Sequence, residues 1–262
     1  MTRLFSRCAA AIAFVISFGV ASSALAADEA TGWSGEVSFS ASAQTGTTRT
    51  LSGTVDAKTT RTWEEDEAAV RLTATYGTSD KDDSVRETTK DSQALFADWM
   101  HTLHERFFVG TQAELSRDST QDRRLRFRVD SGPGYRVWED LNGAKNHFDV
   151  SSGLGYRYEV YDGNTGTSFE DTDVDHFIDA VAGFEYKHLL FDEKIEYTHT
   201  GNVALPANSP SAFIVRSEII VGVPLTEAWS FRTSFLVEYT NEVPDEVKET
   251  TTNATVGLGY KF

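Results

Sequence analysis

The final stretch of the chain, Thr250–Phe262, constrains the fold more than any other segment. Its residues alternate between the two faces of an extended strand. The apolar and aromatic side chains share one face with two threonines: Thr250, Thr252, Ala254, Val256, Leu258, Tyr260 and Phe262. The opposite face holds Asn253, Thr255, Gly257, Gly259 and Lys261. A period of two residues indicates a β-strand with an apolar environment on one side and a polar environment on the other.

Similar alternating stretches recur along the whole chain. They cover residues 33–44, 51–63, 68–76, 95–99, 107–115, 125–135, 148–158, 174–186, 195–197, 213–223, 231–239 and 250–262. The polar connections Thr78–Arg86, Asp162–Thr172, Gly201–Pro210 and Glu242–Glu249 alternate with shorter links. Roughly 20 residues per strand and connection is close to what membrane-spanning β-strands require. We therefore predict an all-β fold, a single antiparallel up-and-down transmembrane β-barrel of about 12 strands.

The two ends of the barrel are expected to differ. An even number of strands places both chain termini on one side of the membrane, which we expect to be the periplasmic side. The closing aromatic residues Tyr260 and Phe262 resemble those of the last strand in bacterial outer-membrane barrels. This resemblance implies an assembly signal, and hence the barrel-assembly machinery as a partner.

The N-terminal segment has the features of an export signal. Arg3 and Arg7 precede an apolar run over residues 9–20, and small residues end it at Ala26. This pattern predicts a cleaved signal peptide over residues 1–26, a short segment over 27–31 and the barrel over 32–262. Cys8, the one cysteine of the chain, lies within the signal. The exported protein is therefore expected to contain neither a disulfide nor a thiolate metal site.

The charge of the chain limits its partners. The net charge is −16, and no cluster of basic residues on a helix face offsets it, so we expect no binding to nucleic acid. Acidic loops at the outer rim are expected to share divalent cations with lipopolysaccharide. Outer-membrane lipid and lipopolysaccharide are therefore predicted partners, and small ions or solutes are candidates.

Aromatic residues are predicted to form two girdles where hydrocarbon meets water. The tryptophans fall at strand ends on the expected periplasmic side: Trp33, Trp63, Trp99, Trp138 and Trp229. Tyrosines are expected at the outer ends of the strands that run outward: Tyr76, Tyr158, Tyr197 and Tyr239. A soluble sandwich would instead tend to bury such rings in mid-strand, which favours the membrane barrel.

Charged residues on the polar faces of the strands are expected to line the lumen. The candidates are Arg124, Arg126, Arg128, Asp130, Arg136, Arg157, Glu159, Glu185, Arg216, Glu218, Arg232 and Glu238. They are interpreted either as a plug of paired charges or as a constriction that filters ions. About eight strands leave an interior filled by side chains, and sixteen to eighteen leave a channel. Twelve lie between these limits, and so many long charged side chains favour packing.

Other motifs give weaker indications of chemistry. Three Gly-x-Gly-Tyr repeats begin at Gly132, Gly153 and Gly257, and are expected to let strands bend or to leave room for a long lumen side chain. The pair His101 and His104 lacks metal-site spacing, and the chain contains no His-x-Ser. We predict no catalytic residue, no metal site and no cofactor. The rim residues Asp175-His176 and Asp82-Asp83 keep a barrel protease as an alternative.

Several short motifs resemble the family of salt-induced outer-membrane proteins, whose defining domain has no assigned function. They are Gly32–Phe39, Ser42–Thr48, Asp98-Trp99 and Gly132–Arg136, and the resemblance extends from about Gly32 to Phe262. It implies location in the bacterial outer membrane and a link to salt or osmotic stress. The predicted function is a non-enzymatic envelope barrel or a narrow charge-lined pore. The alternatives are a barrel enzyme (a rim protease or lipid hydrolase) and a soluble periplasmic binding protein.

Overall fold

The computed structural model describes residues 32–44, 48–81, 87–119, 123–140, 146–162, 172–241 and 249–262. It contains twelve strands: β1 (Trp33–Gln44), β2 (Thr48–Thr62), β3 (Asp66–Lys81), β4 (Glu87–His104), β5 (Phe107–Asp118), β6 (Arg123–Glu139), β7 (His147–Asp162), β8 (Thr172–Leu190), β9 (Ile195–Pro206), β10 (Ile214–Pro224), β11 (Trp229–Thr240) and β12 (Thr250–Lys261). The predicted signal peptide and the segment 27–31 lie outside the described residues.

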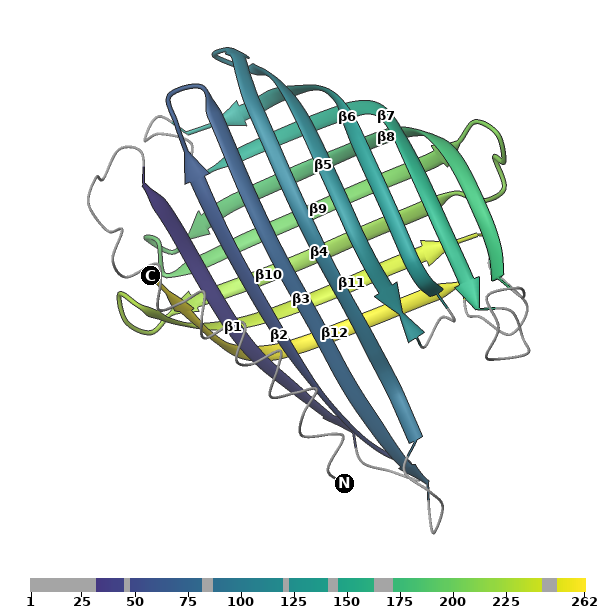
Figure 1. Ribbon diagram of the computed structural model, residues 1–262. Helices are drawn as coiled ribbons and strands as arrows, with labels where there is room; N and C mark the ends of the chain where they lie inside the picture. Colours follow the sequence, from purple (N-terminus) through teal and green to yellow (C-terminus); the bar gives the residue numbers. More distant parts are fainter. Residues whose placement is uncertain are drawn as a thin grey trace.

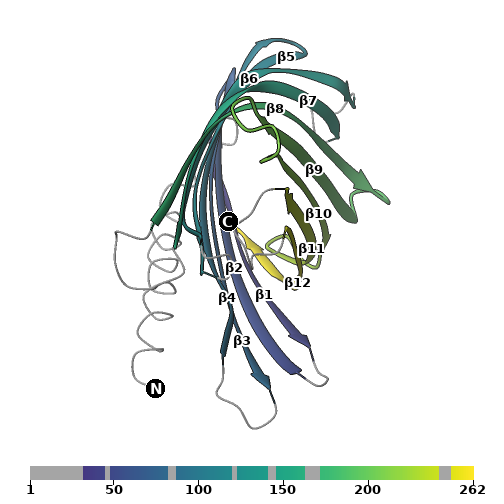
Figure 2. The ribbon, with the colours of Figure 1, turned by 90° about the vertical axis from the view of Figure 1, so that its right-hand side faces the viewer.

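The strands close into one antiparallel barrel, in which each strand pairs with its neighbours in sequence and β1 pairs with β12 (Figure 1). This confirms the predicted fold class and strand number. We call the end that holds Trp33 and Phe262 the terminal end, and the opposite end the loop end. The β1–β2 and β3–β4 hairpins extend beyond the other strands at the loop end (Figure 2).

Strand alternation separates an apolar outer wall from a polar inner wall. On β6, for example, Phe127 is 38% exposed on the outside, while its neighbours Arg126 and Arg128 are 3% and 7% exposed inside. In the part of the chain that the structure describes, the most exposed large apolar side chain within a strand is Leu154 of β7, at 70%. Such a distribution is stable where lipid surrounds the barrel and polar groups satisfy each other within it. Among the described residues, no helix is long and apolar enough to cross a membrane.

Some predicted strand boundaries are wrong. The segment Gly201–Pro210 was expected to be a loop, but β9 continues to Pro206. Gly201 and Asn202 resemble turn residues, yet both pair in register with β10. Likewise β3 continues to Lys81 and thus into the predicted loop Thr78–Arg86. Cross-strand pairing overrides the local turn preference in both cases.

All five tryptophans lie at the terminal end, because they fall in or next to the strand ends there: Trp33, Trp63, Trp99, Trp138 and Trp229. Tyr76, Tyr158 and Tyr239 lie in the loop-end halves of β3, β7 and β11. The placement of Tyr197 at the outer end is wrong. Tyr197 is close to the first residue of β9, so it lies at the terminal end, where its ring packs edge-on against Tyr186 at 6.0 Å.

Candidate functional site: a charged layer inside the barrel

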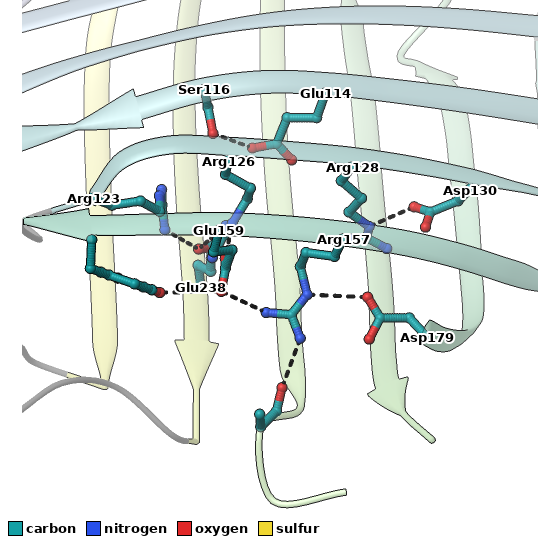
Figure 3. Close-up of polar contacts among 12 residues, drawn as sticks. Glu114, Ser116, Arg123, Arg126, Arg128, Asp130, Arg157, Glu159, Asp179 and Glu238 are labelled. Atoms are coloured by element: carbon teal, nitrogen blue, oxygen red, sulfur yellow. Dashed lines mark hydrogen bonds and ion pairs between the residues drawn. The ribbon is translucent and has the colours of Figure 1, made fainter. Parts of the chain in front are cut away.

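Arg126 of β6 lies at the centre of a charged layer in the loop-end half of the interior (Figure 3). Its Nε donates to Glu159 on the neighbouring strand β7. Its Nη1 donates to Glu238 Oε1 on β11 at 3.0 Å. Strands β6 and β11 are not neighbours in the barrel, so the second contact crosses the interior. The side chains of Arg126 and Glu159 are both only 3% exposed, so this layer excludes most water.

Arg157 of β7 is fully buried beside Glu159, the β7 member of this pair. Its Nε lies 3.1 Å from Asp179 Oδ2 on β8, and its Nη1 lies 3.0 Å from Glu159 Oε2. The guanidinium carbon also lies 4.0 Å from the centroid of the Phe177 ring. Asp179 is as fully buried as Arg157. Two carboxylates and an aromatic face thus compensate a charge that has no access to water.

The segment between β9 and β10 covers the layer from the loop end. Arg157 Nη2 donates to the backbone oxygen of Ala212 at 3.0 Å, and Ala212 is 3% exposed. Asn241 Nδ2 donates to the backbone oxygen of Ser211 at 2.8 Å. Asn208 Nδ2 donates to the backbone oxygen of His176 on β8 at 2.6 Å. These bonds hold the segment against the barrel wall on both sides.

Arg124 does not lie where its sequence pattern placed it. The β6–β7 pairing has a register irregularity between Arg123 and Leu125. As a result Arg124 is exposed, whereas Arg123 is buried with its Nη1 3.9 Å from Glu238 Oε1. A β-bulge reverses the side to which the following residues point, and counting alternate residues cannot detect it. The prediction that Arg124 shares the inner face of Arg126 and Arg128 is therefore wrong.

A second contact crosses the interior at a different level along the barrel axis. Arg71 on β3 directs both terminal nitrogens at Glu218 on β10, with distances of 3.4 and 3.3 Å to the two carboxylate oxygens. Its Nε donates to Asp56 Oδ2 on β2 at 2.6 Å. Arg216 Nη2 lies 3.6 Å from Glu218 Oε2, and its guanidinium carbon lies 5.4 Å from the Phe96 ring centroid. Sequence analysis missed Arg71 and Asp56, although both alternate with outward apolar residues.

The terminal-end half of the interior is more open. The side chain of Glu185 is 49% exposed while it bonds His147 Nε2 at 3.0 Å. Arg136 forms a fork with both oxygens of Asp149 at 2.9 and 3.0 Å. At the mouth, Arg232 Nη1 lies 2.5 Å from Glu36 Oε2 beside a small cavity of about 120 Å³.

The remaining residue of the predicted inner set, Asp130, is paired with Arg128. Arg128 Nε lies 2.6 Å from Asp130 Oδ2. This contact is an ion pair without hydrogen-bond geometry, so Arg128 Nε and Nη2 and Asp130 Oδ1 are all buried without a hydrogen-bond partner. Arg126 Nη2 and Asp179 Oδ1 are likewise buried without a hydrogen-bond partner. Buried groups of this kind favour hydration, so the layer is not a fully satisfied plug.

The glycine repeats allow neighbouring strands of the barrel to approach each other closely. A Cβ on Gly132 of β6 would collide with the backbone of Ser152 on β7, and one on Gly153 would collide with the backbone of Ser131. A Cβ on Gly257 would collide with the backbone of Phe39 on β1. These glycines let neighbouring strands pack more closely than any side chain allows. No phosphate-binding turn is formed, since each lies within a strand.

The histidines are distributed over both walls. His176 Nδ1 lies 2.7 Å from Tyr156 Oη on the outer wall. His101 Nδ1 lies 3.0 Å from Asp66 Oδ1 near the terminal end. Within the described ranges, no group of three or more metal-ligating side chains comes together. Asp82-Asp83 lie outside the described residues.

One pair that sequence analysis missed lies on the lipid-facing wall. His199 Nε2 of β9 lies 3.0 Å from Ser217 Oγ of β10. The rings of Phe184 and Tyr197 flank His199 at 4.9 and 6.5 Å. A serine nucleophile also needs a third group that orients the histidine. Among the described hydrogen bonds, His199 has no carboxylate or amide partner, so each group chiefly satisfies the polarity of the other.

Comparison with known proteins decides the family. A profile of the DUF481 family, described as a protein of unknown function, matches residues 37–262. The chain belongs to the DUF481 family. No curated protein matches this chain significantly in sequence.

Solved structures with a similar fold are bacterial outer-membrane barrels. The translocator domain of the autotransporter NalP from Neisseria meningitidis matches with a TM-score of 0.53 and 16% identity, covering 98% of each chain. The NanC porin matches with a TM-score of 0.48 and 9% identity, covering 87% of this chain and 98% of the porin. The first similarity establishes that this DUF481 chain has the fold of an outer-membrane barrel, as expected.

Proposed function

We propose that this DUF481 protein is a non-enzymatic outer-membrane barrel whose lumen is closed at rest by the charged layer. The observation that carries the proposal is the contact between Arg126 and Glu238, which joins opposite parts of the barrel wall. Arg71 and Glu218 form a second such crossing. A wide, permanently hydrated pore would keep these charges in water, where such pairs contribute little.

A narrow, charge-lined pore is the second candidate. Two observations favour it. Buried polar atoms of Arg128, Asp130 and Asp179 have no hydrogen-bond partner. In addition, the terminal-end half of the interior is open around Glu185. Hydration of these groups would offset part of the cost of separating the pairs. In this proposal small ions are the permeant species, and selectivity depends on Arg126.

The cellular setting follows from the same proposal. The terminal end is periplasmic, and the loop end contacts lipopolysaccharide. The C-terminal residues Tyr260 and Phe262 engage the assembly machinery. A role under salt or osmotic stress fits a barrel held shut by ion pairs, since pairs shielded from solvent respond only weakly to ionic strength.

Single-channel conductance in a planar bilayer tests the closed state. We expect the wild-type protein to show no discrete openings, and Arg126→Ala to show small ones, because Glu238 loses its hydrogen-bonded partner across the lumen and keeps only the longer 3.9 Å contact with Arg123. Arg124→Ala is the matched control, since Arg124 is exposed, and it is expected to behave as wild type. Steady openings of the wild-type protein would support the pore instead, and a silent Arg126→Ala protein would show that other contacts suffice for closure.

A further inference from the structure

An open hollow of about 640 Å³ lies on the outer surface at the terminal end, apart from the charged layer. It is lined by the turn between β2 and β3 and by β4: Trp63, Glu64, Glu65, Asp66 and Trp99. Trp63 is 36% exposed and Trp99 is 44% exposed, so both indole rings are accessible. The hollow therefore combines two aromatic faces with three carboxylates.

Asp66 holds one of the indoles in place. Its Oδ1 accepts a hydrogen bond from Trp99 Nε1 at 3.1 Å and lies 3.0 Å from His101 Nδ1. The Trp99 and His101 rings stack with 6.0 Å between their centroids and 13° between their planes. The backbone also fixes the turn, since Thr102 N donates to Glu65 O at 2.7 Å. The shape of the hollow is thus set before any ligand binds.

The charge of the hollow is unbalanced. Glu64 and Glu65 are both exposed, and neither forms an ion pair within the described part of the chain. A cation does lie on one of the indoles, since the guanidinium carbon of Arg61 is 4.8 Å from the Trp63 ring centroid. Trp63 thus already serves as a platform for a cation. Inside the barrel, in contrast, Glu159, Asp179 and Glu218 each have an arginine partner.

We propose that this hollow binds the ammonium headgroup of a membrane lipid of the phosphatidylethanolamine type. A cation is attracted to an indole face and to nearby carboxylates, and both are present here. Tryptophans at a strand end mark the level of lipid headgroups, so the hollow lies where such headgroups are found. A lipid is therefore a better occupant than a soluble amine, because its acyl chains remain in the bilayer.

Binding is measured with the full-length protein refolded in an uncharged maltoside detergent. The probes are short-chain phosphatidylethanolamine, phosphatidylglycerol with the same acyl chains, and free ethanolamine. The test variants are Glu64→Gln with Glu65→Gln, and Trp99→Leu. Glu227→Gln is the matched control, because Glu227 is an exposed acid in another terminal-end turn, close to Trp229.

We expect wild type to prefer phosphatidylethanolamine over phosphatidylglycerol by about fivefold in Kd, which corresponds to roughly 1 kcal/mol. The Glu64/Glu65 double variant and Trp99→Leu lose this preference, whereas Glu227→Gln retains it. Equal binding of the two lipids by wild type would overturn the proposal. So would a loss in Glu227→Gln as large as in the double variant. Free ethanolamine that binds as tightly as the lipid would overturn the lipid assignment.

Discussion

The guanidinium of Arg71 and the carboxylate of Glu218 face each other across the barrel at 3.3 and 3.4 Å, although they are 147 residues apart in sequence. The two parallel contacts form a fork, the strongest geometry for an arginine–carboxylate pair. Both side chains are less than a third exposed. The contact ties β3 to β10 from inside, independently of the hydrogen-bonded wall.

The energy of this crossing can be measured with a double-mutant cycle. We expect Arg71→Ala and Glu218→Ala to be non-additive, with a coupling within about 0.5–3 kcal/mol, as found for residues in one polar network. The measurement is urea unfolding in lipid vesicles. Arg117 and Asp91 serve as the control pair, since they are 3.9 Å apart and more exposed. Additive changes for Arg71 and Glu218 would mean that the crossing contributes no net energy.

Removal of the buried cation Arg157 should cost far more than removal of a surface cation. Arg157→Met leaves Asp179 without its arginine partner and Glu159 with only Arg126, in a water-poor layer, and we expect a loss of about 3–5 kcal/mol. Arg117→Ala should change the unfolding free energy by less than about 1 kcal/mol. Both are read from the unfolding midpoint and slope. Equal losses of unfolding free energy in the two variants would contradict the conclusion that Arg157 is buried away from water.

The glycine of β6 at position 132 should not tolerate a side chain. Gly132 and Gly110 are partners in the β5–β6 pairing. A Cβ on Gly132 meets the backbone of Ser152, whereas one on Gly110 meets only Trp99 O at 3.9 Å. Gly132→Ala is expected to destabilise the barrel by about 1–3 kcal/mol through overpacking. Gly110→Ala should be close to neutral, and a similar loss in both would rule out strand approach as the cause.

Labelling of intact cells tests the orientation. Ser211 lies in an exposed turn at the loop end, and Glu227 lies in an exposed turn at the terminal end. We expect Ser211→Cys to react with a membrane-impermeant maleimide in intact cells. Glu227→Cys should react several-fold more slowly until the outer membrane is permeabilised. Both proteins carry Cys8→Ser, and the opposite pattern would invert the proposed topology.

Much of the candidate site could be found from alternation alone. The inward positions of Arg126, Arg128, Arg157 and Glu159 follow from counting every second residue in a strand. The same rule fails at Arg124, because a register irregularity shifts the count by one. Alternation does place Arg71 on the inner face, but it cannot show that the partner of Arg71 is Glu218 on the opposite wall. A partner that far away in sequence leaves no local signal.

The sequence by itself determined the class of barrel, its twelve strands, its polar interior and the position of its tryptophans. These follow from period-two alternation and strand-end composition, which are local properties of each strand. Only the tertiary structure decided that Arg126 meets Glu238, that Tyr197 lies at the terminal end, and that Trp63 and Trp99 border one hollow. These relationships depend on register, tilt and closure, which set the depth of each residue and its partner across the lumen.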